Sequence, residues 1–295
     1  MRDTQSQKDS RGVPIEKVGV KSLRYPIVVA DLANRTQQTV AVVNMYVDLP
    51  HQFKGTHMSR FVEILRDHGR AIHVENIAEI VGEMSERLNA EQAHLEITFP
   101  YFMEKKAPVT GSPGLVDYEG FFHANLRGRE LDFAYGVVVP VTTLCPCSKA
   151  ISARGAHNQR GVVRVEVRTR RTVWLEELIQ CVEKSSSSEL YSLLKRQDEK
   201  FVTERAFDHP VFVEDLVRAV AVKLRADPRI AWYRVEAENF ESIHNHNAYA
   251  QVTGATPAPR RAGNHARVDD GPPGPGKPRK KSLRRGRGKG KRTRF

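Results

Sequence analysis

The sequence predicts an α+β protein built from two β-α-α-β units, with the helices on one face of an antiparallel sheet. Apolar residues recur every second residue in some segments and at helical spacing in others, and the order of these segments in the first half returns in outline in the second. With 40% apolar residues, the 295-residue chain can form a sizeable core. We divide it into a flexible leader (1–19), a bimodular folded domain (20–255) and a disordered tail (256–295).

The first unit begins with strands and then changes to helical spacing. Residues 21–27 predict a short strand, and 37–49 a stronger one because β-branched residues dominate it. Thr56 can cap a helix that carries Phe61, Ile64 and Leu65 on one face. Apolar residues at helical spacing predict a second helix over 76–88. Three further strands are expected at 94–102, 114–127 and 130–141.

The second unit opens on residues 160–169, where Val163, Val165 and Val167 alternate with charged residues as in a half-buried strand. Similar periodicities predict the remaining elements. These are a helix over 175–183 with Cys181 as an ordinary helical residue, a hinge at 185–188, a short helical piece at 189–195, a helix over 212–225, and strands at 230–240 and 248–253.

The net charge of +12 belongs entirely to the C-terminal segment. Residues 257–295 contain 14 Lys or Arg and two Asp, whereas the rest of the chain has 33 basic and 33 acidic residues. Apolar residues are nearly missing there, so the tail cannot bury enough surface to offset its ordering entropy. It would attract polyanions such as RNA or DNA, but it could equally be a solvated tail without a partner.

The rest of the composition favours a cytoplasmic protein. No apolar run approaches the length of a membrane span, and residues 1–13 lack the apolar segment of a signal peptide. The three cysteines do not form a disulfide framework, since two are separated by a single residue. We therefore expect a reducing compartment and no membrane partner.

A cluster of soft ligands follows the predicted strand 130–141. Cys145 and Cys147 flank a proline, and His157 lies ten residues beyond the second cysteine. Thiolate and imidazole in a loop are typical of a metal or nucleophile site. The alternative is a pair of small buried residues beside a surface histidine, which we consider less favoured for this spacing.

Four other groups could carry chemistry. Residues 238–246 concentrate carboxylates and imidazoles, and in a strand His244 and His246 would face one pocket; the alternative is an exposed polar loop. Glu199 could ligate a metal, although an exposed carboxylate is the commoner situation. Glu214 begins a helix, where its charge also suits the helix dipole. His57 and Arg60 would be neighbours on a helical turn and could hold phosphate, a weak signal by itself.

The ligand set favours a catalytic metal over a structural one. A closed site of four cysteines is impossible in one chain, while cysteine, histidine and a carboxylate leave a coordination position open for water. The sequence has no Gly-rich phosphate loop, Gly-x-Ser-x-Gly elbow or His-Glu-x-x-His pair.

Five motifs together closely resemble the prokaryotic GTP cyclohydrolase type IB family, in order from about residue 18 to 250. They are Gly-Thr-His-Met-Ser-Arg-Phe (55–61), Leu-Cys-Pro-Cys-Ser-Lys (144–149), Gly-Ala-His-Asn-Gln-Arg (155–160), Asp-Glu-Lys-Phe-Val-Thr-Glu (198–204) and Asn-Phe-Glu-Ser-Ile-His-Asn-His (239–246). The resemblance implies the tunnelling fold (T-fold) with two units per chain. It also implies a homo-oligomer, expected to be a tetramer, with active sites between subunits.

The resemblance implies conversion of GTP and water to 7,8-dihydroneopterin triphosphate and formate, the first step of folate and pterin biosynthesis. It implies that Cys145, His157 and Glu199 bind a divalent metal ion (Mn²⁺, Fe²⁺ or Zn²⁺). It makes Glu214 the carboxylate that anchors the guanine. The implied groups for catalysis are Cys145, Cys147, Glu241, His244 and His246, and those for binding the phosphates are Arg60, Lys149, Arg160 and Lys200.

The sequence also admits two other functions. A related tunnelling-fold enzyme could take another purine or pterin, or release a cyclic phosphate. A non-enzymatic nucleic-acid binder could use the basic tail, which departs from the family pattern because the family ends near residue 250.

Overall fold

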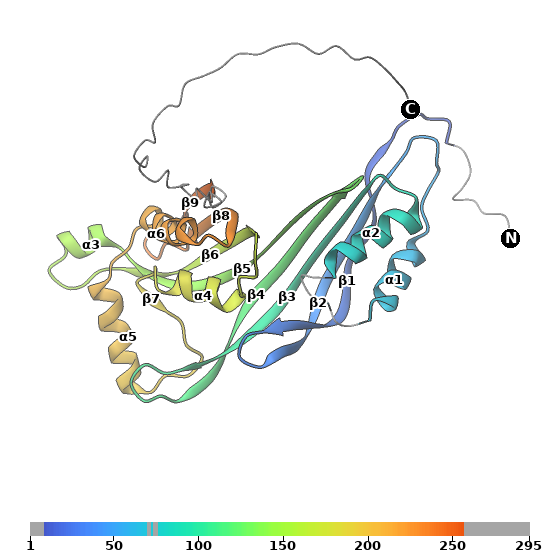
Figure 1. The fold of residues 1–295 in the computed structure, drawn as a ribbon. Coiled ribbons are helices and arrows are strands. Elements are labelled where there is room, and N and C mark those ends of the chain that lie inside the picture. The colour runs from blue at the N-terminus through green and yellow to red at the C-terminus, as the bar shows by residue number, and fades with distance from the viewer. Residues whose placement is uncertain (1–8, 70–71, 73–75, 257–295) are drawn as a thin grey trace, which may run out of the picture. The chain divides into compact units, whose positions relative to one another are not determined.

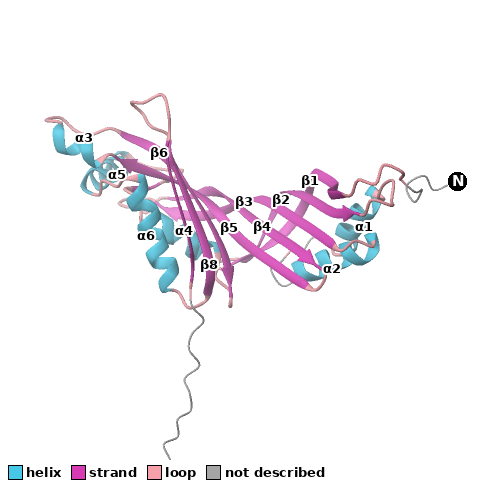
Figure 2. Ribbon diagram, turned by 90° about the horizontal axis from the view of Figure 1, so that it is seen from above, coloured by secondary structure: helices cyan, strands magenta, loops and turns pink. Residues whose placement is uncertain are grey.

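The computed structural model describes residues 9–69, 72 and 76–256. Within them, nine strands form one antiparallel sheet in the order β1-β2-β3-β4-β5-β6-β8-β9, and the short β7 pairs with β5 (Figures 1 and 2). The strands are β1 (Ile15–Asp31), β2 (Arg35–Leu49), β3 (Gln92–Lys106), β4 (Pro113–Arg127), β5 (Glu130–Leu144), β6 (Asn158–Thr169), β7 (Ser188–Glu189), β8 (Ile230–Asn239) and β9 (Ala248–Ala255).

Helices lie beside the sheet in two groups (Figure 2). Helices α1 and α2 pack on β1 to β4, α4 on β5, α5 on β5 and β7, and α6 on β8 and β9. No helix among the described residues is long and apolar enough to cross a membrane. The helices are α1 (Met58–Asp67), α2 (Ile77–Leu88), α3 (Pro146–Ile151), α4 (Leu175–Glu183), α5 (Arg196–Asp208) and α6 (Val213–Ala226).

One hydrophobic core crosses both halves of the chain. Directly paired residues share a face of the sheet, and a row of such pairs runs without interruption through β2, β3, β4, β5, β6 and β8. All members of the row are buried in the same cluster. The row is Val43, Ile97, Phe122, Tyr135, Val167 and Tyr233.

The prediction of two β-α-α-β units was wrong. Strands β5 and β6 pair along ten residues, from Tyr135↔Val167 to Leu144↔Asn158, so the sheet is continuous where the two units were expected to divide. The first half runs β-β-α-α-β-β-β, while α4, β7, α5 and α6 all lie between β6 and β8. Element order alone cannot reveal this arrangement, because pairing between distant strands is set by tertiary contacts.

Several boundaries also differ from the prediction. Strand β1 begins at Ile15, inside the range expected to be a leader, and residues 190–195 are not helical. Helix α5 was not predicted, because its apolar residues form no stripe; of its side chains only Asp198 and Ala206 are buried. The remainder of the predicted tail after Thr256 lies outside the described residues.

Candidate active site

The backbone after β5 presents Cys145 at the start of α3. Cys145 is the N-cap of this helix, and Pro146 at the first helical position has the φ that the turn needs. The backbone N–H of Ser148 donates to Cys145 Sγ at 3.4 Å. The thiol is half-buried, whereas Cys147 is exposed. Local capping thus directs the first cysteine of the motif inward and the second toward solvent.

Three hydrogen bonds hold His157 next to Cys145. The N–H of Cys145 donates to the carbonyl oxygen of His157 at 3.1 Å. The Ser148 hydroxyl donates to the Cys145 carbonyl oxygen at 3.1 Å and accepts from the His157 N–H at 3.2 Å. Gly155, with φ of +101°, allows the loop to turn back. The two predicted ligands are therefore brought together by the backbone of their own loop.

Side chains from β5 and β6 support the imidazole of His157. Its Nδ1 lies 3.0 Å from Gln159 Oε1, and Gln159 Nε2 donates to Thr143 Oγ1 at 2.9 Å. Glu241 Oε2 is 3.9 Å from the same ring nitrogen. Gln159 was not predicted, although it lies at the start of β6 and only two residues after His157.

These residues line a cavity of about 280 Å³. Two backbone hydrogen bonds join the segments that carry these residues. The Val211 N–H donates to the Leu144 carbonyl at 3.0 Å, and the Phe240 N–H donates to the Arg160 carbonyl at 2.9 Å. Segments distant in sequence thus meet at the ends of β5, β6 and β8 and the start of α6. The lining residues are Cys145, His157, Gln159, Val211, Phe212, Val213, Glu214, Asn239, Glu241, His244, His246 and Ala248.

The segment after β8 differs from the strand that was expected. Residues 242–246 form bends, and His244 and His246 are exposed, as in the alternative of a polar loop. Their rings still stack, with centroids 5.0 Å apart and planes at 17°. Asn239 ends β8 on the buried face, 3% exposed, and its Oδ1 has no hydrogen-bond partner. Sequence reasoning missed Asn239; a polar residue in phase with Val235 and Ala237 was the available signal.

Glu199 does not belong to this cavity lining. It lies exposed in the first turn of α5. Among the described residues, no group of three or more His, Cys, Asp or Glu side chains could hold a metal ion. The donor chemistry of Cys145 and His157 still fits a divalent ion such as Zn²⁺ or Fe²⁺. This chain thus places two of the three predicted ligands together, and the role of Glu199 stays a prediction.

The predicted phosphate-binding cations are dispersed. Arg60 on α1 donates to the Arg87 carbonyl on α2 at 2.9 Å. Lys200 forms an ion pair with Glu204 at 2.6 Å on the exposed surface of α5. Lys149 donates to the Phe207 carbonyl, and its Nζ lies 4.2 Å from the centre of the Phe207 ring. Arg160 is exposed on β6, beside the cavity-lining Gln159.

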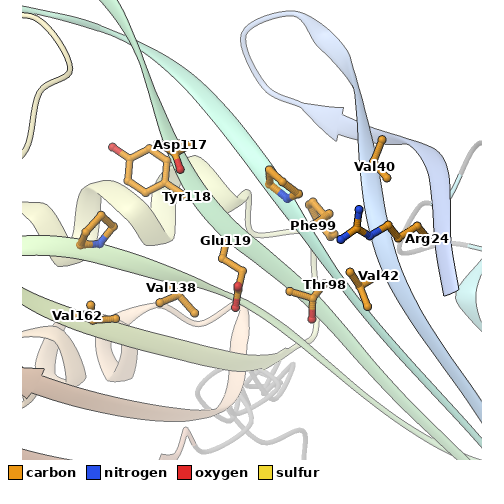
Figure 3. Close-up of a pocket in the computed structure, with 12 residues that line it drawn as sticks. Arg24, Val40, Val42, Thr98, Phe99, Asp117, Tyr118, Glu119, Val138 and Val162 are labelled. Carbon is orange, nitrogen blue, oxygen red and sulfur yellow. The ribbon is translucent and has the colours of Figure 1, made fainter. Parts of the chain in front are cut away.

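A larger cavity, of about 620 Å³, lies over the strands and contains none of the predicted site residues (Figure 3). Its lining mixes apolar side chains such as Val40, Val42 and Val138 with charged ones such as Arg24 and Glu119. It has no thiol or imidazole. We therefore assign the chemistry to the smaller cavity, where groups able to bind metal and move protons converge.

Comparison with known proteins finds a matching family model and similar relatives. Residues 1–250 match the family model described as type I GTP cyclohydrolase FolE2. The chain is 56% identical over 254 residues to the GTP cyclohydrolase FolE2 of Magnetococcus marinus, covering 86% of this chain and 96% of the relative. It is also 56% identical over 255 residues to that of Syntrophotalea carbinolica, covering 85% and 94%.

Among solved structures, a mutant urate oxidase from Bacillus sp. TB-90 is similar in fold. The TM-score is 0.50 at 9% sequence identity, covering 82% of this chain and 100% of the other. This likeness concerns the arrangement of the backbone alone and agrees with the continuous sheet. The family match and the two close relatives show that the chain belongs to the type I GTP cyclohydrolase FolE2 family.

Proposed function

We propose that this chain is a GTP cyclohydrolase, a hydrolase acting on a cyclic amidine, which converts GTP and water to 7,8-dihydroneopterin triphosphate and formate in folate biosynthesis. The observation that carries the proposal is the single cavity in which a thiol, three imidazoles and two carboxylates meet. Membership of the FolE2 family supports the choice of substrate. We also propose a cytoplasmic location.

The cavity has a suitable size for the base of the nucleotide. Ligand pockets commonly measure about 300–1,000 Å³, so a cavity of about 280 Å³ suits a purine better than a whole nucleoside triphosphate. Glu214, in the first turn of α6, is the carboxylate we assign to the guanine. Its two oxygens can accept from the ring N–H and the exocyclic amine together.

The triphosphate would then extend out of the cavity toward cations. Lys149 and Arg160 belong to the segments that form the cavity, whereas Arg60 and Lys200 come from other surfaces. We propose a homo-oligomer, expected to be a tetramer, in which a neighbouring subunit completes the site. The dispersed positions of Arg60, Lys200 and the predicted ligand Glu199 support this proposal.

A divalent ion bound by Cys145 and His157 would activate water toward C8 of the purine. Its identity among Mn²⁺, Fe²⁺ and Zn²⁺ belongs to the proposal. The chain's own groups then act on protons. Glu241 and the stacked pair His244 and His246 line the cavity and are suited to take a proton from water and give one to the opening imidazole ring. Cys147, which is exposed, is assigned to positioning.

The test is GTP turnover by the full chain, followed by formate release and the absorbance of the pterin product. Chelation should abolish both signals, and one of the three ions should restore them. Cys145→Ala should lower turnover by at least about 100-fold, because it removes a proposed ligand. Cys181→Ala, in the last turn of α4, is the matched control and should leave turnover unchanged.

Two results would count against the proposal. Metal binding and formate release at the normal rate by Cys145→Ala would remove Cys145 from the site. Mass spectrometry that showed a ring-opened or cyclic phosphate product in place of dihydroneopterin triphosphate would support the alternative of a related enzyme that catalyses a different reaction.

A further inference from the structure

The side-chain amide of Gln159 is in contact with a neighbouring side chain at each end. Its side chain lies between His157 and Thr143 and is 8% exposed, while Thr143 is fully buried. Thr143 and Gln159 are directly paired in the β5–β6 ladder. The amide is therefore held between two strands and has little freedom to rotate.

The two ends of this amide make different hydrogen bonds. Nε2 donates to Thr143 Oγ1 at 2.9 Å, and Oε1 faces His157 Nδ1 at 3.0 Å. An amide carbonyl oxygen only accepts, so the ring nitrogen in contact with it must carry the proton. The other ring nitrogen, Nε2, then retains its lone pair.

Glu241 is the other acceptor that faces this nitrogen. Its nearest oxygen is 3.9 Å from His157 Nδ1, beyond hydrogen-bond distance. Gln159 is thus the group that orients the ring. A neutral imidazole without a fixed acceptor at Nδ1 could adopt either tautomer, and one of them has a proton where a metal ion would bind.

We propose that Gln159 is a positioning residue that holds His157 as its Nδ1–H tautomer, so that Nε2 is the ligand atom for the divalent ion. This inference rests on the proposed metal role of His157 and adds the residue that sets the tautomer of its ring. Partners of this kind fix the ring orientation of metal-binding histidines, and their loss typically costs about 10–100-fold in metal affinity.

The test compares two variants of the full chain. Gln159→Met has similar length but no strong acceptor, whereas Gln159→Glu keeps an oxygen toward His157. Co²⁺ affinity, measured by absorption titration that includes the thiolate-to-cobalt band, should fall about 10–100-fold in Gln159→Met. It should be retained or increased in Gln159→Glu. Gln180→Met, on the exposed side of α4, is the control and should bind as the unmodified chain does.

A purely structural role for Gln159 predicts the opposite ranking. The apolar methionine would then be tolerated better than a buried carboxylate, in thermal unfolding and in metal binding alike. Nitrogen NMR of the histidine rings in the metal-free chain gives a second readout without any substitution. It should show His157 protonated at Nδ1, and Thr143→Val, which releases the amide, should give a mixture of tautomers.

The outcomes separate the inference from the function beneath it. Unchanged Co²⁺ affinity in Gln159→Met, or a His157 ring protonated at Nε2 in the unmodified metal-free chain, would overturn the role of Gln159 alone. The second result would mean that the amide is turned, with its NH₂ group toward the ring. No Co²⁺ binding by the unmodified chain, or a Co²⁺ spectrum unaffected by Cys145→Ala, would overturn the metal site together with it.

Discussion

At the scale of single residues, the sheet contains a buried carboxylate outside the cavity, and its partners are basic side chains. Glu166 on β6 is 5% exposed and contacts His123 at 3.3 Å and Arg234 at 2.6 Å. Burial would raise the pKa of Glu166, but hydrogen bonds and charge from His123 and Arg234 outweigh it and lower the pKa to about 2. The carboxylate is therefore stabilised in its charged form.

Glu166→Gln should reduce stability at neutral pH by on the order of 2–3 kcal/mol. A carboxyl whose pKa is lowered on folding stabilises the protein above its ordinary pKa of 4.5, and this contribution is lost as the pH falls from about 4.5 to about 2. Urea unfolding at pH 7 and at pH 2.5 measures it. The difference between variant and unmodified chain should be large at pH 7 and small at pH 2.5.

The exposed Glu130→Gln at the start of β5 is the matched control, with little effect at either pH. An equal loss of stability at both pH values in Glu166→Gln would show that packing, and not the charge of Glu166, produces the effect.

At the scale of elements, the contact between β6 and β8 depends on a glycine. Gly161 pairs with Asn239, and a Cβ atom at Gly161 would lie 2.7 Å from Asn239 Oδ1 and 3.3 Å from Val141 Cγ2. The glycine therefore makes room for the buried amide of Asn239, which lines the cavity. The unpaired Oδ1 is costly, by about 1–3 kcal/mol for a buried polar group, which is consistent with a role in the site.

Gly161→Ala should destabilise the chain by about 1–3 kcal/mol, the range typical of overpacking. It should also lower turnover, since the displaced amide would enter the cavity. Thermal unfolding and GTP turnover are the measurements. Gly82→Ala on α2, where an added Cβ meets nothing within 4 Å, is the control and should be neutral or stabilising.

The double variant Gly161→Ala/Asn239→Ala identifies the clashing partner. It should recover most of the lost stability without recovering turnover, because the smaller side chain at 239 vacates the space. A double variant less stable than Gly161→Ala would mean that the clash lies with Val141 instead.

At the scale of the whole molecule, the basic tail and the folded body differ in charge. The tail carries the entire formal charge of +12. The last described residue, Thr256, is still part of the fold: its N–H donates to the Ala231 carbonyl at 2.9 Å, and Arg170 donates to its carbonyl oxygen. A chain ending at Thr256 therefore keeps the pairing of β9 with β8 and both hydrogen bonds of Thr256.

Truncation after Thr256 should leave GTP turnover unchanged, because every residue assigned to the site precedes it. It should also reduce the salt concentration that elutes the protein from heparin, since fourteen basic residues are removed. Loss of turnover in a folded truncated chain would show that the tail contributes to activity. It would then favour the alternative of a nucleic-acid binder.

The site was predictable from the sequence to the extent that it is local. Cys145 and His157 belong to one loop, so their spacing already indicated proximity, and His244 and His246 are two residues apart. Gln159 and Asn239 were missed because their importance comes from partners on other strands, Thr143 and Gly161. Glu199 is exposed on α5 and is not among the residues that line the cavity, so its metal role stays a prediction from the sequence.

The sequence by itself determined the local periodicities, the neutral body with its basic tail, and the family. Each depends on residues close together in the chain or on motifs compared directly. Only the tertiary structure decided that β5 and β6 join both halves into one sheet and that the ends of β5, β6 and β8 meet at one cavity. The reason is physical: strand register and side-chain contacts between distant segments minimise the free energy of the whole fold, and no single segment encodes them.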